Sequence, residues 1–187
     1  MKKLKFVTTN KHKVEEIGAI LKDYDIELEQ VSIDYPENKE ASMEEIAQEA
    51  VKNLAEKLGE PMIVEDTGLY FKAYNNFPGA QPKFVFNSIG YDGIFRLLAG
   101  KDRGAYFKTV IGYCEPGKNP ILFDGEMHGQ ITEKVINPDA DLMPYTKIFI
   151  PDGQTKSTAE MTTEERLKIS QRGKASRKLG EYLANKK

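Results

Sequence analysis

Apolar residues recur along the chain with two different periods. Residues 3–8 and 61–66 carry short apolar runs, and residues 26–33 alternate between apolar and polar positions, as strands do. Residues 10–22 and 42–58 instead place their apolar side chains at helical spacing. The first third of the chain is therefore predicted to alternate between strands and helices.

The rest of the chain carries more strand signals. Residues 105–115 and 119–135 predict two strands joined by the turn EPGKNP, and TKIFIP predicts a short strand. A short helix is expected near residues 89–100, and a last helix is expected to begin near Thr163. Between them, the letters TGL at 67–69 are predicted to form a turn at the end of a strand.

Nothing in the composition divides the chain. It has 187 residues, of which 40% are apolar and 30% are charged, and it contains no low-complexity tract or linker. Alternating helices and strands in a chain of this size predict an α/β fold. We expect a central mixed β-sheet flanked by helices, formed by residues 1–187 as a single domain.

Charge and cysteine content narrow the class of protein. The 27 basic and 29 acidic residues give a net charge of -2, whereas a nucleic-acid binder usually carries a basic surplus. The basic run RLKISQRGKASRKL leaves nucleic-acid binding open as an alternative, although no aromatic residue interleaves its cations. No window approaches the roughly 18 apolar residues of a membrane span. The single cysteine, Cys114, indicates a buried strand thiol in a reducing cytoplasm.

The stretch FVTTNKHK lies where the first strand meets the first helix. Backbone N–H groups at a helix N-terminus, together with its positive dipole end, are suited to bind anions. Thr8 can add a hydroxyl, Asn10 an amide and Lys13 a positive charge. The same residues are also compatible with an ordinary capped helix, so this stretch by itself leaves both interpretations open.

The stretch VEDTGL places two carboxylates at the end of a buried strand. Because neighbouring strand residues point to opposite faces, Glu65 and Asp66 are not expected to share one solvated face. A buried carboxylate without a partner is costly, and a metal ion or another cation would offset that cost. With Glu37, Lys52 and Lys83, these acids supply oxygen ligands for a hard cation and positive charges for phosphates.

These motifs, in this order, are similar to those of a known family. FVTTNKHK, YPE, VEDTGL, FPG, GAYFKTVIGYC and FIPDG followed by STAEMTTEE occur between residues 4 and 180. In them the chain resembles the inosine triphosphate pyrophosphatases, in particular the archaeal and eukaryotic branch. Members of that family hydrolyse non-standard purine nucleoside triphosphates to the monophosphate and pyrophosphate.

The resemblance implies a fold, a cofactor and a role for each matched residue. The family fold is elongated and two-lobed with the nucleotide in the cleft between the lobes, the metal is Mg²⁺, and the members are usually homodimers. By this match Asp66 is the catalytic acid that activates water. The metal residues would be Glu37, Glu65 and Asp66, the phosphate-binding residues Thr8, Asn10, Lys13, Lys52 and Lys83, and the base-binding residues Tyr145, Thr146, Gln171 and Arg172.

The departures from the family pattern lie at positions that the resemblance assigns to the base pocket. Gln171 stands where the family usually has histidine, Thr146 where it has aspartate, and Met143 where it has an aromatic residue. In addition, Gln81 replaces a frequent tyrosine. Since an amide can turn to present a donor or an acceptor, we expect altered or relaxed base preference. A nucleotide-binding regulatory or scaffold protein with little turnover is the alternative function.

Overall fold

The computed structural model describes residues 2–33 and 41–186. The strands are β1 (Lys2–Val7), β2 (Ile26–Val31), β3 (Met62–Phe71), β4 (Pro78–Gly79), β5 (Gly104–Cys114), β6 (Ile121–Ile131) and β7 (Phe149–Pro151). The α-helices are α1 (Lys11–Leu21), α2 (Met43–Leu58), α3 (Pro82–Leu97), α4 (Thr163–Ile169) and α5 (Gln171–Asn185). Short 3₁₀ helices are η1 (Lys22–Tyr24), η2 (Pro144–Ile148) and η3 (Thr158–Glu160).

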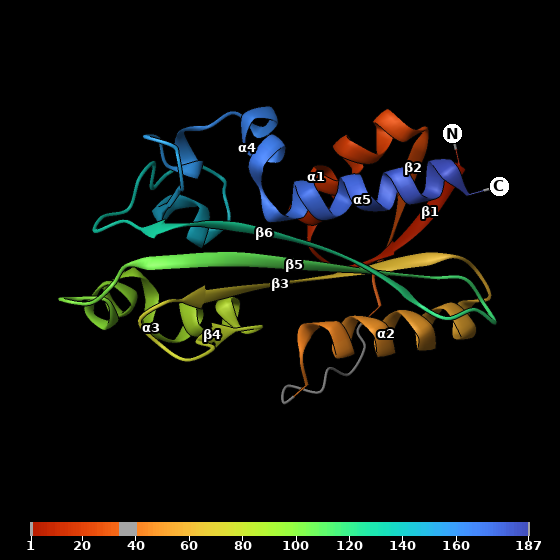
Figure 1. The fold of residues 1–187 in the computed structure, drawn as a ribbon, viewed down its shortest axis with the longest axis horizontal. Coiled ribbons are helices and arrows are strands. Elements are labelled where there is room, and N and C mark those ends of the chain that lie inside the picture. Colours follow the sequence, from red (N-terminus) through yellow and green to blue (C-terminus); the bar gives the residue numbers. More distant parts are fainter. Residues whose placement is uncertain (1, 34–40, 187) are drawn as a thin grey trace.

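Within these described ranges the strands form one mixed sheet of seven, in the order β2-β1-β3-β5-β6-β7 with β4 beside β3. β1 runs parallel to β2 and β3, and the pairs from β3 through β7 are antiparallel. Helices α1, α4 and α5 lie above the sheet in Figure 1, and α2 and α3 lie below it. The predicted α/β fold with a mixed sheet flanked by helices is confirmed.

Three apolar clusters fill the space between the sheet and the helices. One lies around Phe6 and Leu179, where α1 and α5 pack on the sheet. A second lies around Val51, between α2 and the other face of the sheet. The third occupies the far end of the molecule, where Phe71 and Phe149 pack with residues of α3 and η2. The long strands β3, β5 and β6 run through both ends, so they join the two lobes of an elongated molecule (Figure 1).

The helices at the N-terminal end begin and end where the sequence indicates. Asn10 caps α1 by accepting from the backbone N–H of His12 at 3.0 Å. Ser42 and Glu45 form the capping box of α2, which ends at Gly59 with a left-handed backbone. Each cap satisfies backbone groups that the first or last turn leaves unpaired.

One prediction about the middle of the chain is wrong, and another is correct except for its bounds. The letters TGL do not turn, because β3 continues through them to Phe71 and pairs with β5 along its whole length. The short helix expected at 89–100 is present as the second part of α3, after a break in helical geometry at Gly90, but α3 begins earlier, at Pro82, and ends at Leu97. In β3 the antiparallel partner strand outweighs the local turn preference of a Thr-Gly pair.

The C-terminal helix is broken, which the periodicity did not predict. Ser170 has an extended backbone that ends α4, and its hydroxyl caps α5 by accepting from the N–H of Gly173 at 3.0 Å. Arg177 donates to the carbonyl oxygens of Leu167 and Lys168 at 3.0 and 2.9 Å. These bonds satisfy the carbonyls that α4 exposes at its end.

The basic run over these two helices does not form a continuous stripe. Arg166 and Arg172 are buried, and Lys178 forms an ion pair with Asp124 at 2.8 Å. Two arginines of the run are therefore part of the protein interior and are not available on a solvated surface. Over residues 2–33 and 41–186, no helix combines the length and apolarity needed to cross a membrane.

Candidate active site

A cavity of about 640 Å³ opens where the sheet splits between its two lobes. β1 pairs with β3 only at Met62 and Ile63, and β4 covers the same edge of β3 only at Leu69 and Tyr70. The intervening edge of β3 therefore faces the cavity. Residues from both lobes line it, including the end of β1, the start of α1, α3, η2 and the α4–α5 junction.

The residues of the predicted phosphate grip lie together on the cavity wall. Thr8, Asn10 and Lys13 all line it, just after β1 and in the first turn of α1. The hydroxyl of Thr8 accepts from the backbone N–H of Asn10 at 3.2 Å, which shapes the turn before the helix. Lys13 donates to the backbone carbonyl of Glu65 at 2.9 Å. The helix N-terminus and a lysine thus meet beside β3, an arrangement suited to phosphate oxygens.

The two neighbouring acids of β3 have different surroundings, as their alternation predicts. Glu65 is buried, whereas Asp66 is partly exposed on the cavity wall. The Oδ1 atom of Asp66 accepts from the backbone N–H of Thr67 at 2.9 Å, which limits the rotation of the carboxylate. Asp66 therefore lies within the cavity as an oriented carboxylate, the position required of a general base.

Glu65 lies at the centre of a buried network of charges. Its Oε2 atom lies 2.6 Å from the ammonium of Lys13, and its Oε1 atom accepts from Nε of Arg172 at 3.0 Å. The hydroxyl of Thr67 donates to Oε1 at 2.5 Å and lies 2.6 Å from the hydroxyl of Thr109. Oε1 therefore accepts hydrogen bonds from Arg172 and Thr67, whereas Oε2 lies in an ion pair with Lys13 but has no hydrogen-bond partner among the described residues.

This network sets the protonation of Glu65. Burial raises its pKa, but the positive charges of Arg172 and Lys13 outweigh burial and lower the pKa from 4.5 to about 2. A carboxylate with a depressed pKa stabilises the folded state above its unfolded pKa, and it loses that contribution as the pH falls toward the folded value.

We therefore expect the free energy of unfolding to fall by about 3 kcal/mol between pH 4.5 and pH 2 through Glu65 alone. Urea unfolding at a series of pH values measures this effect. In Glu65→Gln the same interval should show a smaller loss. A wild-type stability that stays constant below pH 4.5 would contradict the network.

The wall of the cavity also carries the predicted base-binding residues. Tyr145 and Thr146 come from η2, and Gln171 comes from the first position of α5. The hydroxyl of Tyr145 donates to the carbonyl of Pro82 at 3.1 Å, and burial raises the pKa of Tyr145. Its ring also meets Phe86 edge-on, with 6.0 Å between the ring centroids.

Gln171 has an unusual hydrogen-bonding state on this wall. Only 7% of the residue is exposed, and its Oε1 atom is buried without a hydrogen-bond partner among the residues that the structure describes. Leaving a buried amide oxygen unpaired costs about 1–3 kcal/mol. A ligand donor, or a turn of the amide toward one, would remove that cost.

Arg172 lines the cavity but is held by protein partners. Besides Glu65, its guanidinium donates to Glu16 at 2.5 Å and to the hydroxyl of Thr67 at 3.3 Å. Its predicted contact with the base stays a prediction. The structure instead places Arg172 between two carboxylates, close to the phosphate grip.

Glu16 and Arg166 also line the cavity, and neither was predicted from the sequence. Both are buried, and they form an ion pair at 3.4 Å. A signal for Glu16 is present in the sequence, because it directly precedes the buried Ile17 on the inner side of α1. An acidic residue there needs a buried cation, but only the fold shows which one.

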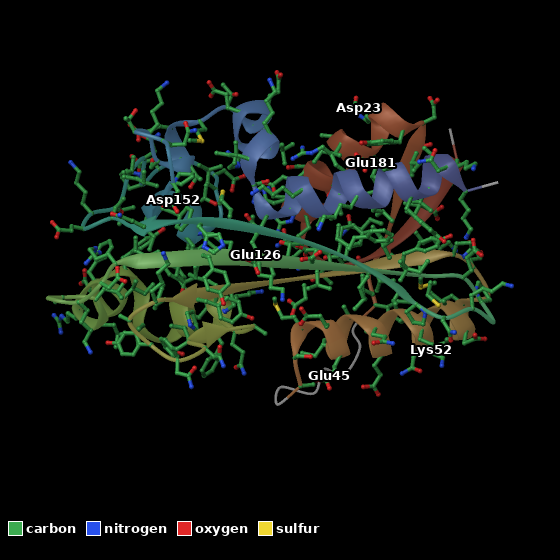
Figure 2. All side chains as sticks on the ribbon, viewed as in Figure 1. Asp23, Glu45, Lys52, Glu126, Asp152 and Glu181 are labelled. Atoms are coloured by element: carbon green, nitrogen blue, oxygen red, sulfur yellow. The ribbon has the colours of Figure 1, made fainter. Side chains whose placement is uncertain are left out.

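The remaining predicted residues have different outcomes. Lys83 lines the cavity from the start of α3 and is exposed. Lys52 does not line it and lies exposed on the side of α2 that is turned away from the sheet (Figure 2), so its predicted contact with phosphate stays a prediction. Helical geometry turns that position of α2 away from the sheet. Glu37 lies outside the described residues.

The residues on the wall fit one divalent cation in part. Among residues 2–33 and 41–186 no group of three or more acids, histidines or cysteines forms a metal site. Mg²⁺ needs fewer protein ligands than that, since it usually takes one or two carboxylates together with substrate phosphates. Asp66 suits this role in the cavity, whereas the negative charge of Glu65 is already paired with the two cations Lys13 and Arg172.

Comparisons with known proteins agree with this geometry. The dITP/XTP pyrophosphatase of Methanopyrus kandleri is 45% identical over 184 residues, which cover 98% of this chain and 97% of that protein. The inosine triphosphate pyrophosphatase of Aspergillus fumigatus is 38% identical over 97% of this chain and 94% of its own. The structure of a HAM1 protein from Coxiella burnetii has a TM-score of 0.83 at 24% identity, with both chains fully covered.

The family model that matches the chain extends the agreement over nearly all of its elements. It is the Ham1 family, and the match runs from residue 4 to residue 182, from β1 into the last turns of α5. That range contains every element that lines the cavity. The chain therefore belongs to the Ham1 family of nucleoside triphosphate pyrophosphatases.

Proposed function

We propose that this protein hydrolyses non-standard purine nucleoside triphosphates such as ITP, dITP and XTP to the monophosphate and pyrophosphate. The arrangement of the cavity carries the proposal. The same cavity is lined by Asn10 and the cation Lys13, by the aromatic Tyr145 and the amide Gln171, and by Asp66. The names of the relatives in Methanopyrus and Aspergillus agree with this substrate class.

The chain supplies the groups for attack of water at the α-phosphorus. Thr8, Asn10 and the N-terminus of α1 bind phosphate oxygens, and Lys13 and Lys83 offset their negative charge. Asp66 orients the attacking water and accepts its proton, which is typically worth about 10²–10⁴-fold in rate. The bond from the α-phosphorus to the bridging oxygen breaks, and pyrophosphate leaves.

We assign the divalent cation as Mg²⁺, held by Asp66 and, as the sequence match indicates, by Glu37. When bound, Mg²⁺ neutralises phosphate oxygens that the lysines do not reach. Glu65 contributes to the site through its cation partners, as argued below. The proposed metal ligands are therefore Asp66, which the structure describes, and Glu37, which lies outside the described residues.

The predicted base-binding residues support a broader substrate range than side chains that can only donate hydrogen bonds would give. Inosine and xanthosine carry a 6-oxo acceptor where adenosine carries an amino donor. The amide of Gln171 can turn to meet either, and Thr146 carries no charge to fix the orientation of a base N–H. Arg172, a donor only, already has carboxylate partners. We therefore infer a weaker preference for 6-oxo purines.

A substrate panel tests both parts of this proposal. Pyrophosphate release is measured with and without Mg²⁺ on ITP, dITP, XTP, GTP, ATP and pyrimidine triphosphates. We expect Mg²⁺-dependent release from ITP and XTP, with measurable release from GTP or ATP. A strong preference for ITP and XTP over the other nucleotides would contradict the inferred relaxed base preference. Tight binding of a nucleotide without turnover of any would favour a regulatory nucleotide-binding protein.

Gln171→His is the paired variant, because an imidazole with a fixed tautomer presents fewer arrangements than an amide. We expect the ratio of kcat/KM for ITP over ATP to rise by about 10-fold, which corresponds to one hydrogen bond of about 1.4 kcal/mol. Gln154→His, on an exposed turn outside the cavity, is the control. If the ratio of kcat/KM for ITP over ATP is unchanged in Gln171→His, Gln171 does not contribute to recognition of the base.

We further propose that the protein acts in the cytoplasm as a homodimer and that residues 1–187 form one domain. The three strands that run through both lobes support a single domain, since neither lobe has a complete sheet without them. The buried, unpaired thiol of Cys114 is compatible with a reducing compartment. Sedimentation equilibrium measures the oligomeric state.

A further inference from the structure

Glu65 contacts one predicted phosphate-binding residue, Lys13, and one predicted base-binding residue, Arg172. Through Oε2 it meets the ammonium of Lys13, on the phosphate side, at 2.6 Å. Through Oε1 it meets Arg172, beside the base wall, at 3.0 Å. The Glu65 side chain is fully buried, and that of Arg172 is 3% exposed, so water does not screen this pair. One carboxylate therefore joins two side chains that come from opposite ends of the sequence.

The negative and positive charges buried around Glu65 nearly cancel one another. Glu65 and Glu16 face three cations, Lys13, Arg166 and Arg172, which leaves one net positive charge in the buried cluster. That surplus suits a cavity for phosphates. If Glu65 turned to a metal ion instead, Lys13 or Arg172 would lose a carboxylate partner in a buried position, which is strongly unfavourable.

We propose that Glu65 is a positioning residue that holds Lys13 and Arg172 in place and does not ligate the divalent cation. This inference rests on the proposed function, because it gives a role in that reaction. Lys13 has a flexible four-carbon side chain. The side-chain carboxylate and the backbone carbonyl of Glu65 hold the Lys13 ammonium beside Asp66 before any ligand binds. The Lys13 side chain therefore loses little conformational entropy when phosphates bind.

The experiment separates a positioning role from a metal-binding role with two probes. Inorganic tripolyphosphate, titrated by calorimetry in EDTA, reports on the phosphate grip without a base. Mn²⁺, titrated by electron paramagnetic resonance, reports on the cation site without a substrate. In Glu65→Gln, which keeps the size and loses the charge, we expect about 10-fold or greater loss of tripolyphosphate affinity and unchanged Mn²⁺ affinity. Asp66→Asn is the matched control and should show the reverse.

A second comparison keeps the test valid if Glu65→Gln folds poorly. Lys13→Met with Glu65→Gln removes one charge of each sign, so the buried cluster keeps its net charge, and Arg172 keeps its contact with Glu16. If Glu65 acts on phosphates through Lys13, this double variant should bind tripolyphosphate as weakly as Lys13→Met alone, and it should bind Mn²⁺ as the wild type does. Thermal unfolding confirms that each variant is folded.

Three results would overturn the inference. They are a loss of Mn²⁺ affinity on replacing Glu65, an unchanged tripolyphosphate affinity in folded Glu65→Gln, and further loss of tripolyphosphate affinity in the double variant beyond Lys13→Met. Wild-type turnover is measured separately. Its absence would refute the proposed function, whereas the two titrations decide the position of Glu65 without any turnover.

Discussion

Replacing Asp66 by asparagine should reduce kcat for pyrophosphate release by at least about 10²–10⁴-fold, the range that a positioned general base contributes. Asparagine keeps the size of the side chain and an oxygen that can accept from the N–H of Thr67, as Asp66 does at 2.9 Å. It loses the negative charge and the ability to take a proton. The measured quantity is kcat on ITP at saturating Mg²⁺.

Asp124→Asn provides a control in the same row of the sheet. Val110 lies between the two acids in register, paired with Asp66 on one side and Asp124 on the other. Asp124 does not line the cavity and pairs with Lys178. Its replacement should leave kcat unchanged. Wild-type turnover in Asp66→Asn would show that another group accepts the proton, and the assignment of Asp66 would then be wrong.

Replacing Gly173 by alanine should destabilise the protein by about 1–3 kcal/mol or more, as overpacking at a tightly packed site does. A methyl group there would lie 1.9 Å from the carbonyl oxygen of Leu167, which is backbone and therefore unable to move away alone. The α4–α5 junction would have to open, and with it Gln171 and Arg172 would move. Urea unfolding measures the stability, and the KM for ITP should rise in parallel.

Gly18→Ala is the matched control, since it is also a glycine within a helix. Its added methyl group meets only the side chain of Leu28, at 3.9 Å. The higher helix propensity of alanine should leave the stability unchanged or raise it by up to about 1 kcal/mol. Equal stability changes in the two variants would show that the junction at Ser170 does not depend on close backbone packing.

Local signals predicted the elements that have strong local causes. The helical spacing of residues 10–22 and 42–58 predicted α1 and α2, and the caps at Asn10, Ser42 and Gly59 that fix their ends act within a few residues. The alternation in β3 also predicted that Glu65 and Asp66 would face different surroundings. The junction between the first strand and the first helix also suggested Thr8, Asn10 and Lys13 as anion-binding candidates, whereas the resemblance to the pyrophosphatase family assigned Asp66 as the catalytic acid.

The error at residues 67–69 arose where a distant segment decides the local structure. The Thr67-Gly68 pair has turn preference, but pairing with β5 keeps β3 extended. Lys52 has suitable chemistry for phosphate, but it is exposed on α2 and does not line the cavity, so the structure adds no support to its predicted contact. A single residue type or spacing carries no information about either outcome.

Periodicity and caps act over short distances, so the sequence alone determined the α/β class and offered the strand-to-helix junction as an anion site or an ordinary capped helix. The role of Asp66 as base came from the resemblance to the pyrophosphatase family. Only the tertiary structure decided that the last helix breaks at Ser170 and that Glu16, Arg166 and Arg172 form one buried charge cluster with Glu65 and Lys13. Burial decides this, since a charge removed from water must find its partner wherever the fold brings one, here up to 156 residues away.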